Sequence, residues 1–212
     1  YLVIAAGDDD PNLDTHDIAH FFQHVLERVD WTRDLHFQTR TTIDTLDYSG
    51  EGWNAGSKLV IACRGEKKRA LTTEIPANLR LPSGFSEPFY CLPGILAVKG
   101  PAYASQTAGT ADAESLCRAL EDADLAGTPL ILIVDDSRFT AATLNNFVWS
   151  AFTRSNPSHD VYGVRSFTEF KHWGCRGPLV IDARKKPHHA PELTPDPEVV
   201  KRVDQLLSAY KF

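Results

Sequence analysis

Lys99 is the residue whose type and position most directly suggest chemistry. It follows the apolar segment 95–98 and precedes Gly100 and Pro101, so a short strand should end at the lysine and the chain should turn sharply after it. An ammonium group on such a turn is suited to bind a phosphate or a carboxylate. Most lysines are simply solvated surface residues, and the spacing alone leaves both interpretations open.

Two carboxylates follow another apolar segment, residues 130–134. In open α/β sheets, ligands bind at the carboxyl ends of parallel strands, so Asp135 and Asp136 could hold a metal or a ribose. They could equally cap the next loop and helix, and we favour this structural role. The residues after them, 137–139, contain no glycine, which argues against a dinucleotide site.

Histidines and a cysteine offer weaker candidates. His16, His20 and His24 are four residues apart and would share one helix face. The glutamate of a zinc-protease motif is missing, so we interpret the three as the polar flank of an amphipathic helix. Cys175 has one histidine nearby but no specified acid, which favours a packed thiol over a nucleophile.

Aromatic side chains gather in a loop late in the chain, at Phe167, Phe170 and Trp173. Aromatic residues in a loop at a sheet edge either line a ligand pocket or fill a subunit interface. The pattern does not separate these two possibilities.

The elements that must position these residues recur along the chain. The first copy consists of the strand 2–6, Asp34 and the strand 59–64. The second copy consists of the strand 130–134, Asp160 and the strand 179–184. The strands are too continuously apolar to be half-exposed antiparallel strands, so they predict a parallel sheet covered on both faces. We therefore predict an α/β fold of parallel-sheet βαβ units that is internally duplicated, with a chance likeness of two βαβ units as the alternative.

The chain divides into three predicted segments. Residues 1–75 form the first βαβ copy, residues 76–94 a proline-rich bridge, and residues 95–212 a C-terminal domain that ends in a helix. Asp14 and Thr140 are the predicted caps of the helices in the two copies.

Two more helices are predicted. The first covers residues 111–124, and the second begins at Pro197 behind the cap Asp196. The apolar stripe of this last helix should pack on the body or on a neighbouring subunit. The segment His188–Pro195 before it is predicted to be an exposed arm.

Composition narrows the class of protein further. The 212 residues carry a formal charge of −6, which argues against nucleic acid as a partner. The sequence shows neither a membrane-spanning segment nor a signal-like start. Four cysteines without a CxxC pair predict free thiols and a cytoplasmic location. Because methionine is absent and the chain opens within an apparent strand, we expect the trailing piece of a longer protein.

The C-terminal part of the sequence resembles the UbiD decarboxylases. The resemblance rests on the strand and acidic pair of residues 130–136, the tryptophan-bearing helix that leads into Thr-Arg-x-x-Pro at 153–157, and the closing segments 172–191 and 196–200. Together these motifs cover about residues 95–205. Residues 1–75 match less directly and look like the extra repeat of long family members.

The resemblance implies a carboxy-lyase that acts on aromatic or unsaturated acids, such as a 4-hydroxybenzoate-type acid, with prenylated FMN. In the family an upstream flavin-binding domain, for which this chain shows no counterpart, binds the cofactor, a divalent metal and potassium. The C-terminal domain is implied to form homo-oligomers and to close the active site. The fragment alone should be inactive, with neither catalytic nor metal-ligating residues of its own.

The resemblance also assigns roles to single residues. Lys99 is implied to bind the cofactor phosphate, although Tyr103 follows it by four residues where the family has a tyrosine after three. Tyr103, Phe167, Phe170 and Trp173 are implied candidates for the substrate pocket. The alternative is a non-enzymatic duplicated α/β module that assembles oligomers or binds an anion. A reading frame that continues upstream into a flavin domain would favour the enzyme, and one that begins at Tyr1 would favour the module.

Overall fold

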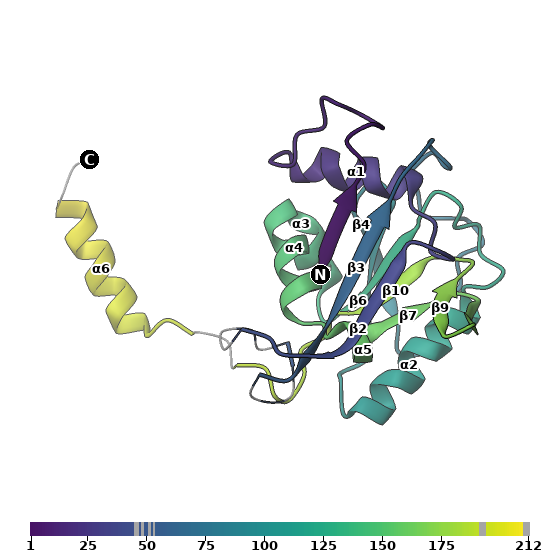
Figure 1. The fold of residues 1–212 in the computed structure, drawn as a ribbon. Helices are drawn as coiled ribbons and strands as arrows, with labels where there is room; N and C mark the ends of the chain where they lie inside the picture. Colours follow the sequence, from purple (N-terminus) through teal and green to yellow (C-terminus); the bar gives the residue numbers. More distant parts are fainter. Residues whose placement is uncertain (45–46, 48, 51, 53, 191–193, 210–212) are drawn as a thin grey trace.

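The computed structural model describes residues 1–44, 47, 49–50, 52, 54–190 and 194–209. In this part of the chain the strands form a three-stranded sheet, a five-stranded sheet and a two-stranded hairpin, with helices packed around them (Figure 1). The α/β class predicted from the sequence is confirmed.

The first half of the chain builds the three-stranded sheet. Its strand order is β1 (Leu2–Ala5), β3 (Gly56–Cys63), β2 (Leu35–Thr41). β1 and β3 are parallel, whereas β2 runs antiparallel to β3. Helix α1 (Ile18–Arg28) follows β1, and its buried face includes Phe22, Val25 and Leu26. The predicted cap Asp14 is wrong: the Asp17 carboxylate accepts from the His20 amide, because the helix begins one turn later.

The second half builds the five-stranded sheet. Its strand order is β4 (Ser86–Leu92), β5 (Ile95–Lys99), β6 (Leu130–Val134), β10 (Leu179–Asp182), β7 (Val161–Gly163). The three central strands are parallel, as predicted, and their side chains are almost all buried. Both edge strands are antiparallel, so the sheet is mixed rather than purely parallel. β4 lies within the segment interpreted as a bridge.

Helices and a hairpin complete the second half. They are α2 (Gln106–Ala119), α3 (Ser137–Ala142), α4 (Leu144–Thr153), α5 (Pro157–Asp160) and the hairpin strands β8 (Ser166–Glu169) and β9 (His172–Cys175). α2 starts and ends five residues earlier than predicted, because Ser105 caps it. The predicted cap Thr140 is wrong, since it lies inside α3. Asp136 caps α3 and Thr143 caps α4.

The two halves share a strand pattern. In each, a parallel pair (β1 with β3, β6 with β10) carries an antiparallel strand on its second member (β2, β7). Asp34 and Asp160 also correspond: each carboxylate accepts a hydrogen bond from the backbone amide four residues earlier, at 2.9 and 2.6 Å. These likenesses support an internal duplication, which stays a prediction.

One hydrophobic core joins the two halves. The Phe22 ring of α1 meets the Phe147 ring of α4 edge to face, with centroids 5.3 Å apart. The Trp31 indole donates to the Pro129 carbonyl at 2.8 Å, just before β6. The first half therefore covers one face of the five-stranded sheet, and α2 covers the other.

Helix α6 (Pro197–Ala209) stands away from this body (Figure 1). Its predicted start at Pro197 is confirmed. The apolar stripe is solvent-exposed, at Val199, Val200, Val203, Leu206 and Leu207. In the predicted arm, residues 191–193 lie outside the described residues, and His189 is half-buried rather than exposed. Among the described helices, none is long and apolar enough to cross a membrane.

Candidate functional site

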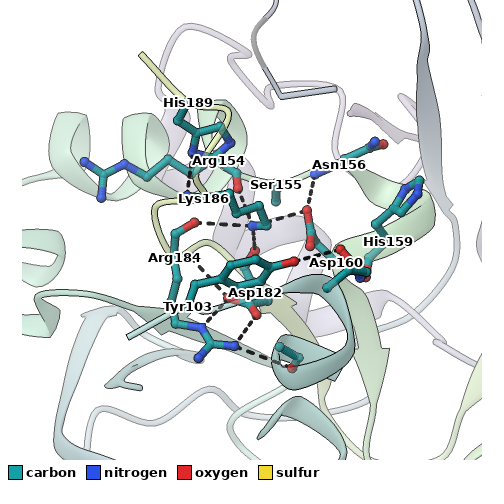
Figure 2. A network of polar contacts seen from close by, with 12 residues as sticks. Tyr103, Arg154, Ser155, Asn156, His159, Asp160, Asp182, Arg184, Lys186 and His189 are labelled. Carbon is teal, nitrogen blue, oxygen red and sulfur yellow. Dashed lines mark hydrogen bonds and ion pairs between the residues drawn. The ribbon is translucent and has the colours of Figure 1, made fainter. Parts of the chain in front are cut away.

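Charged side chains concentrate at the carboxyl edge of the five-stranded sheet, where β5, β6 and β10 end. Figure 2 shows the centre of this group, in which Arg184 and Lys186 leave the end of β10 and meet acidic groups from α5 and β10. Both cations are buried, as are Asp160 and Asp182. Buried charges are costly unless each is paired, so the partners decide what this cluster can do.

Arg184 is completely buried and has anionic partners on two sides. Its guanidinium donates from Nε and Nη2 to the two oxygens of Asp182, at 2.9 and 2.6 Å, and from Nη1 to Asp112 at 2.8 Å. Nη1 also donates to the Pro101 carbonyl at 2.8 Å. Hydrogen bonds to the two carboxylates raise the pKa of Arg184 against the effect of its burial. The residue ties β10 to α2 and to the turn after β5.

Lys186 is the second buried cation. Its Nζ donates to the carbonyls of Arg154 and Asp182, at 2.8 and 3.0 Å, and lies 3.3 Å from Oδ2 of Asp160. The Tyr103 ring lies against both cations, with its centroid 5.2 Å from Lys186 Nζ and 5.3 Å from the Arg184 guanidinium. Tyr103 is therefore part of a cation–π stack, in which the ring's negative face stabilises the two charges.

Asp160 and His189 each carry one buried polar atom without a hydrogen-bond partner among the described residues: Oδ1 of Asp160 and Nε2 of His189. Burial raises the pKa of Asp160 to about 6, although the nearby Lys186 ammonium opposes that change. Burial and the same ammonium lower the pKa of His189 to about 4. A neutral His189 fits its geometry, because its Nδ1 accepts the Lys186 amide at 3.1 Å.

Lys99 lies at the same sheet edge but is half-exposed. It ends β5 beside Val134, and its Nζ is 3.6 Å from the carboxylate of Glu87 on β4. Lys99 and Tyr103 thus both belong to the carboxyl edge. The lysine forms an ion pair with one carboxylate, so a phosphate would have to compete with Glu87 for it.

The three aromatic candidates, Phe167, Phe170 and Trp173, lie near the amino end of β10, at the end of the five-stranded sheet opposite to Lys99 and Tyr103. β7 ends at Gly163, which pairs with Leu179 at the amino end of β10, and the β8–β9 hairpin extends beyond it. The Phe167 ring lies under Arg176, and Trp173 packs edge to face on Phe37. Phe170 is fully exposed at the hairpin turn. The structure therefore does not bring these residues together with Lys99 and Tyr103.

The remaining candidates have structural roles. Asp136 caps α3, and Asp135 accepts from the Arg154 guanidinium at 3.0 Å and from the Lys185 amide at 2.8 Å. His16 precedes α1, so it does not share a helix face with His20 and His24. All four cysteines are free, and burial raises the pKa of Cys175 to about 12. In the described ranges no group of three or more His, Cys, Asp or Glu residues could hold a metal ion.

Comparison with known proteins gives the class of this chain. The family model of the 3-octaprenyl-4-hydroxybenzoate carboxy-lyase C-terminal domain matches residues 1–63. An uncharacterised protein of Chlamydia trachomatis is 31% identical over 192 residues, which is 88% of this chain and 30% of that protein. A protein of Chlamydia pneumoniae, named as one of the subunits of 4-hydroxybenzoate decarboxylase, is 29% identical over 202 residues, with the same coverages.

Solved structures give a weaker likeness. The closed form of vanillic acid decarboxylase from Sedimentibacter hydroxybenzoicus is 13% identical, with a TM-score of 0.41 over 81% of this chain and 44% of that chain. Its open form is 15% identical, with a TM-score of 0.38 over 82% and 45%.

The described part of the chain is thus an α/β protein with a match to the C-terminal domain of a carboxy-lyase family. It belongs to the UbiD family, as a C-terminal portion, and spans about 30% of the length of the two curated relatives. The family match covers residues 1–63, the half for which the sequence motifs gave the less direct resemblance.

Proposed function

We propose that the chain is the C-terminal portion of a UbiD-like carboxy-lyase for an aromatic or unsaturated acid of the 4-hydroxybenzoate type. The observation that carries the proposal is the family match of residues 1–63, followed by a second unit with the same strand pairing. The decarboxylase named among the relatives supports the substrate class. The proposed location is the cytoplasm, and the proposed partner is an upstream flavin-binding domain that holds a divalent metal and potassium.

The proposed cofactor is prenylated FMN, which supplies an electron sink for the loss of carbon dioxide when it is bound. Lys99 is the residue that we assign to its phosphate. Lys99 fits that group because its ammonium is half-exposed at the carboxyl end of β5, where an anion can reach it. The three aromatic candidates lie at the opposite end of the sheet from Lys99, at Phe167, Phe170 and Trp173. They can therefore belong to the same pocket as Lys99 only if another subunit or domain completes that pocket. Tyr103 is held by Arg184 and Lys186, which makes a structural role its simpler assignment.

The chain alone should not decarboxylate any aromatic acid, because we assign it no catalytic carboxylate and no metal ligand. The measurement is carbon dioxide release from 4-hydroxybenzoate and related acids, with prenylated FMN, a divalent metal and potassium present. The longer product of the encoding reading frame is the positive control. Carbon dioxide release by the chain alone well above a buffer blank would contradict the assignment of catalysis to an upstream domain. A reading frame that begins at Tyr1 would favour the non-enzymatic module.

Lys99→Ala should weaken cofactor binding by the longer protein about 10- to 100-fold. A charge-assisted hydrogen bond of roughly 1.5–3 kcal/mol is lost, whereas folding should hardly change because the side chain is half-exposed. Titration of the apo protein with the cofactor measures the affinity. Lys58→Ala, an exposed lysine of β3, is the matched control. Equal cofactor affinities for wild type and Lys99→Ala would show that Lys99 is an ordinary surface lysine that does not bind the cofactor.

Helix α6 is the proposed contact with a second copy of the chain. Its five apolar stripe residues are 42–59% exposed. A second uncovered apolar surface lies on β1, where Leu2 and Ile4 are exposed, although parallel strands are normally covered on both faces. We expect the chain to be a homo-oligomer and Leu206→Glu/Leu207→Glu to be a monomer by light scattering. An unchanged mass would exclude α6 from the interface.

A further inference from the structure

Two cations meet one carboxylate beside the end of β5. Lys99 Nζ lies 3.6 Å from Oε1 of Glu87, and Arg138 Nε lies 3.2 Å from Oε2 of the same side chain. The two oxygens of Glu87 therefore have one cation each. This is the arrangement that two cations would adopt around the oxygens of a bound phosphate.

The three charged residues come from three different elements: Lys99 from β5, Arg138 from α3 and Glu87 from β4. Two contacts join α3 to β4. The Arg138 guanidinium lies over the Phe89 ring of β4, 4.7 Å from its centroid. The buried Ser137 hydroxyl donates to the Glu87 carbonyl at 2.5 Å. These contacts hold the Arg138 guanidinium and the Glu87 backbone in place independently of the ion pairs, so the fold brings the two residues together while the Glu87 carboxylate stays free to move.

Glu87 has an unusual backbone for its residue type. Its φ is +50°, directly before Pro88, and the pairing of β4 with β5 is irregular between Ser86 and Phe89. A left-handed backbone is costly for glutamate, whereas glycine or asparagine would adopt it more easily. A side chain that adopts a strained backbone beside two cations is a candidate for a function.

We infer that Lys99 and Arg138 form a two-cation clamp for a phosphate monoester, and that the Glu87 carboxylate occupies the clamp until the phosphate displaces it. The inference rests on the proposed function for the identity of that phosphate, the flavin's, and adds Arg138 as its second ligand and Glu87 as an internal competitor. Displacement is feasible because the three side chains are 39–70% exposed and exposed ion pairs are weak. A dianionic phosphate gains more from two cations than a single carboxylate does.

The test is a titration of the full chain with inorganic phosphate, FMN and riboflavin, which lacks the phosphate. Glu87→Gln removes the competing charge and should tighten the binding of phosphate and FMN about five- to tenfold. Lys99→Gln and Arg138→Gln should each weaken it about tenfold. Glu114→Gln is the matched control, because Glu114 is an exposed carboxylate paired with Arg118 on α2.

The outcomes separate the clamp from the flavin assignment. Tighter phosphate binding by Glu87→Gln, but not by Glu114→Gln, supports the clamp. The same titration of the longer protein, which includes the proposed flavin-binding domain, tests the flavin assignment. If its affinity for FMN is the same for wild type, Lys99→Gln and Arg138→Gln, while these variants weaken phosphate binding by the chain, the clamp stands and the flavin assignment fails. An unchanged affinity of Glu87→Gln, an Arg138→Gln variant that binds as wild type, or no measurable phosphate binding by wild type and Glu87→Gln would each overturn the clamp.

Discussion

Arg184→Met should lower the free energy of unfolding by about 3–5 kcal/mol, the cost of breaking a buried ion pair from one side. The substitution leaves the Asp182 carboxylate, which is 1% exposed, without the guanidinium that binds both of its oxygens. It also removes the bonds from β10 to Asp112 and to the Pro101 carbonyl. Urea denaturation followed by circular dichroism measures the change.

Two further variants make this prediction specific. Arg184→Lys keeps the charge but cannot reproduce the forked contacts, so it should recover only part of the loss and should still fold. Arg118→Met removes an exposed arginine on α2 and should change stability by less than about 0.5 kcal/mol. A loss below about 1 kcal/mol for Arg184→Met would show that water or movement compensates the buried carboxylates.

Lys186→Met should also cost about 3–5 kcal/mol near pH 7.5, because it leaves the Asp160 carboxylate buried without its cation. The loss should shrink markedly at pH 5. Burial raises the pKa of Asp160 to about 6 in the folded protein, above its ordinary value of 3.8. Between these values the folded wild type binds more protons than the unfolded chain, so this group's contribution to stability falls as pH rises through about 6. Without the Lys186 ammonium, which lowers this pKa, Asp160 stays neutral at pH 5 and its burial costs little in the variant. Unfolding of both proteins across pH 5–8 measures the effect.

The double variant Lys186→Met/Asp160→Asn provides the control for this explanation. It removes both charges, so it should be more stable at pH 7.5 than Lys186→Met and should lose most of the pH dependence. If Lys186→Met were equally destabilised at pH 5 and 7.5, the lost bonds to the Arg154 and Asp182 carbonyls would explain the cost instead.

The sequence predicted the buried strands better than the edges of the sheets. β5, β6 and β10 are short apolar runs, and burial on both faces requires such runs. The sequence places β4 in a bridge because Pro88 lies within it and Pro93 follows it directly. An edge strand tolerates proline, however, because one of its sides makes no ladder hydrogen bonds. β2 alternates apolar and polar residues from Leu35 to Gln38, a signal of an edge strand that was available in the sequence.

The charged cluster was harder to predict. Arg184 and Lys186 follow a strand end and read as exposed basic residues, since lysine and arginine are rarely buried. Their burial depends on partners far along the chain, Asp112 for Arg184 and Asp160 for Lys186. Glu87 and Arg138 were missed for the same reason, because β4 and α3 meet only in the folded chain. The position of Lys99 at a strand end could be predicted because its signal is local, whereas its role in binding phosphate stays a prediction.

The shared core has a consequence for synthesis of the chain on the ribosome. The apolar face of α1, at Phe22, Val25 and Leu26, packs in a cluster that also needs Phe147 and Ala151 of α4 and the strand β10. At about 5–20 residues per second, some 120 further residues after β3 take on the order of 10 s to emerge. During that interval the first half presents an uncovered apolar helix and sheet. We therefore expect ribosome-associated chaperones to bind the nascent chain until β10 is complete. Synonymous codon changes that slow translation between β3 and β10 should lower the yield of native protein.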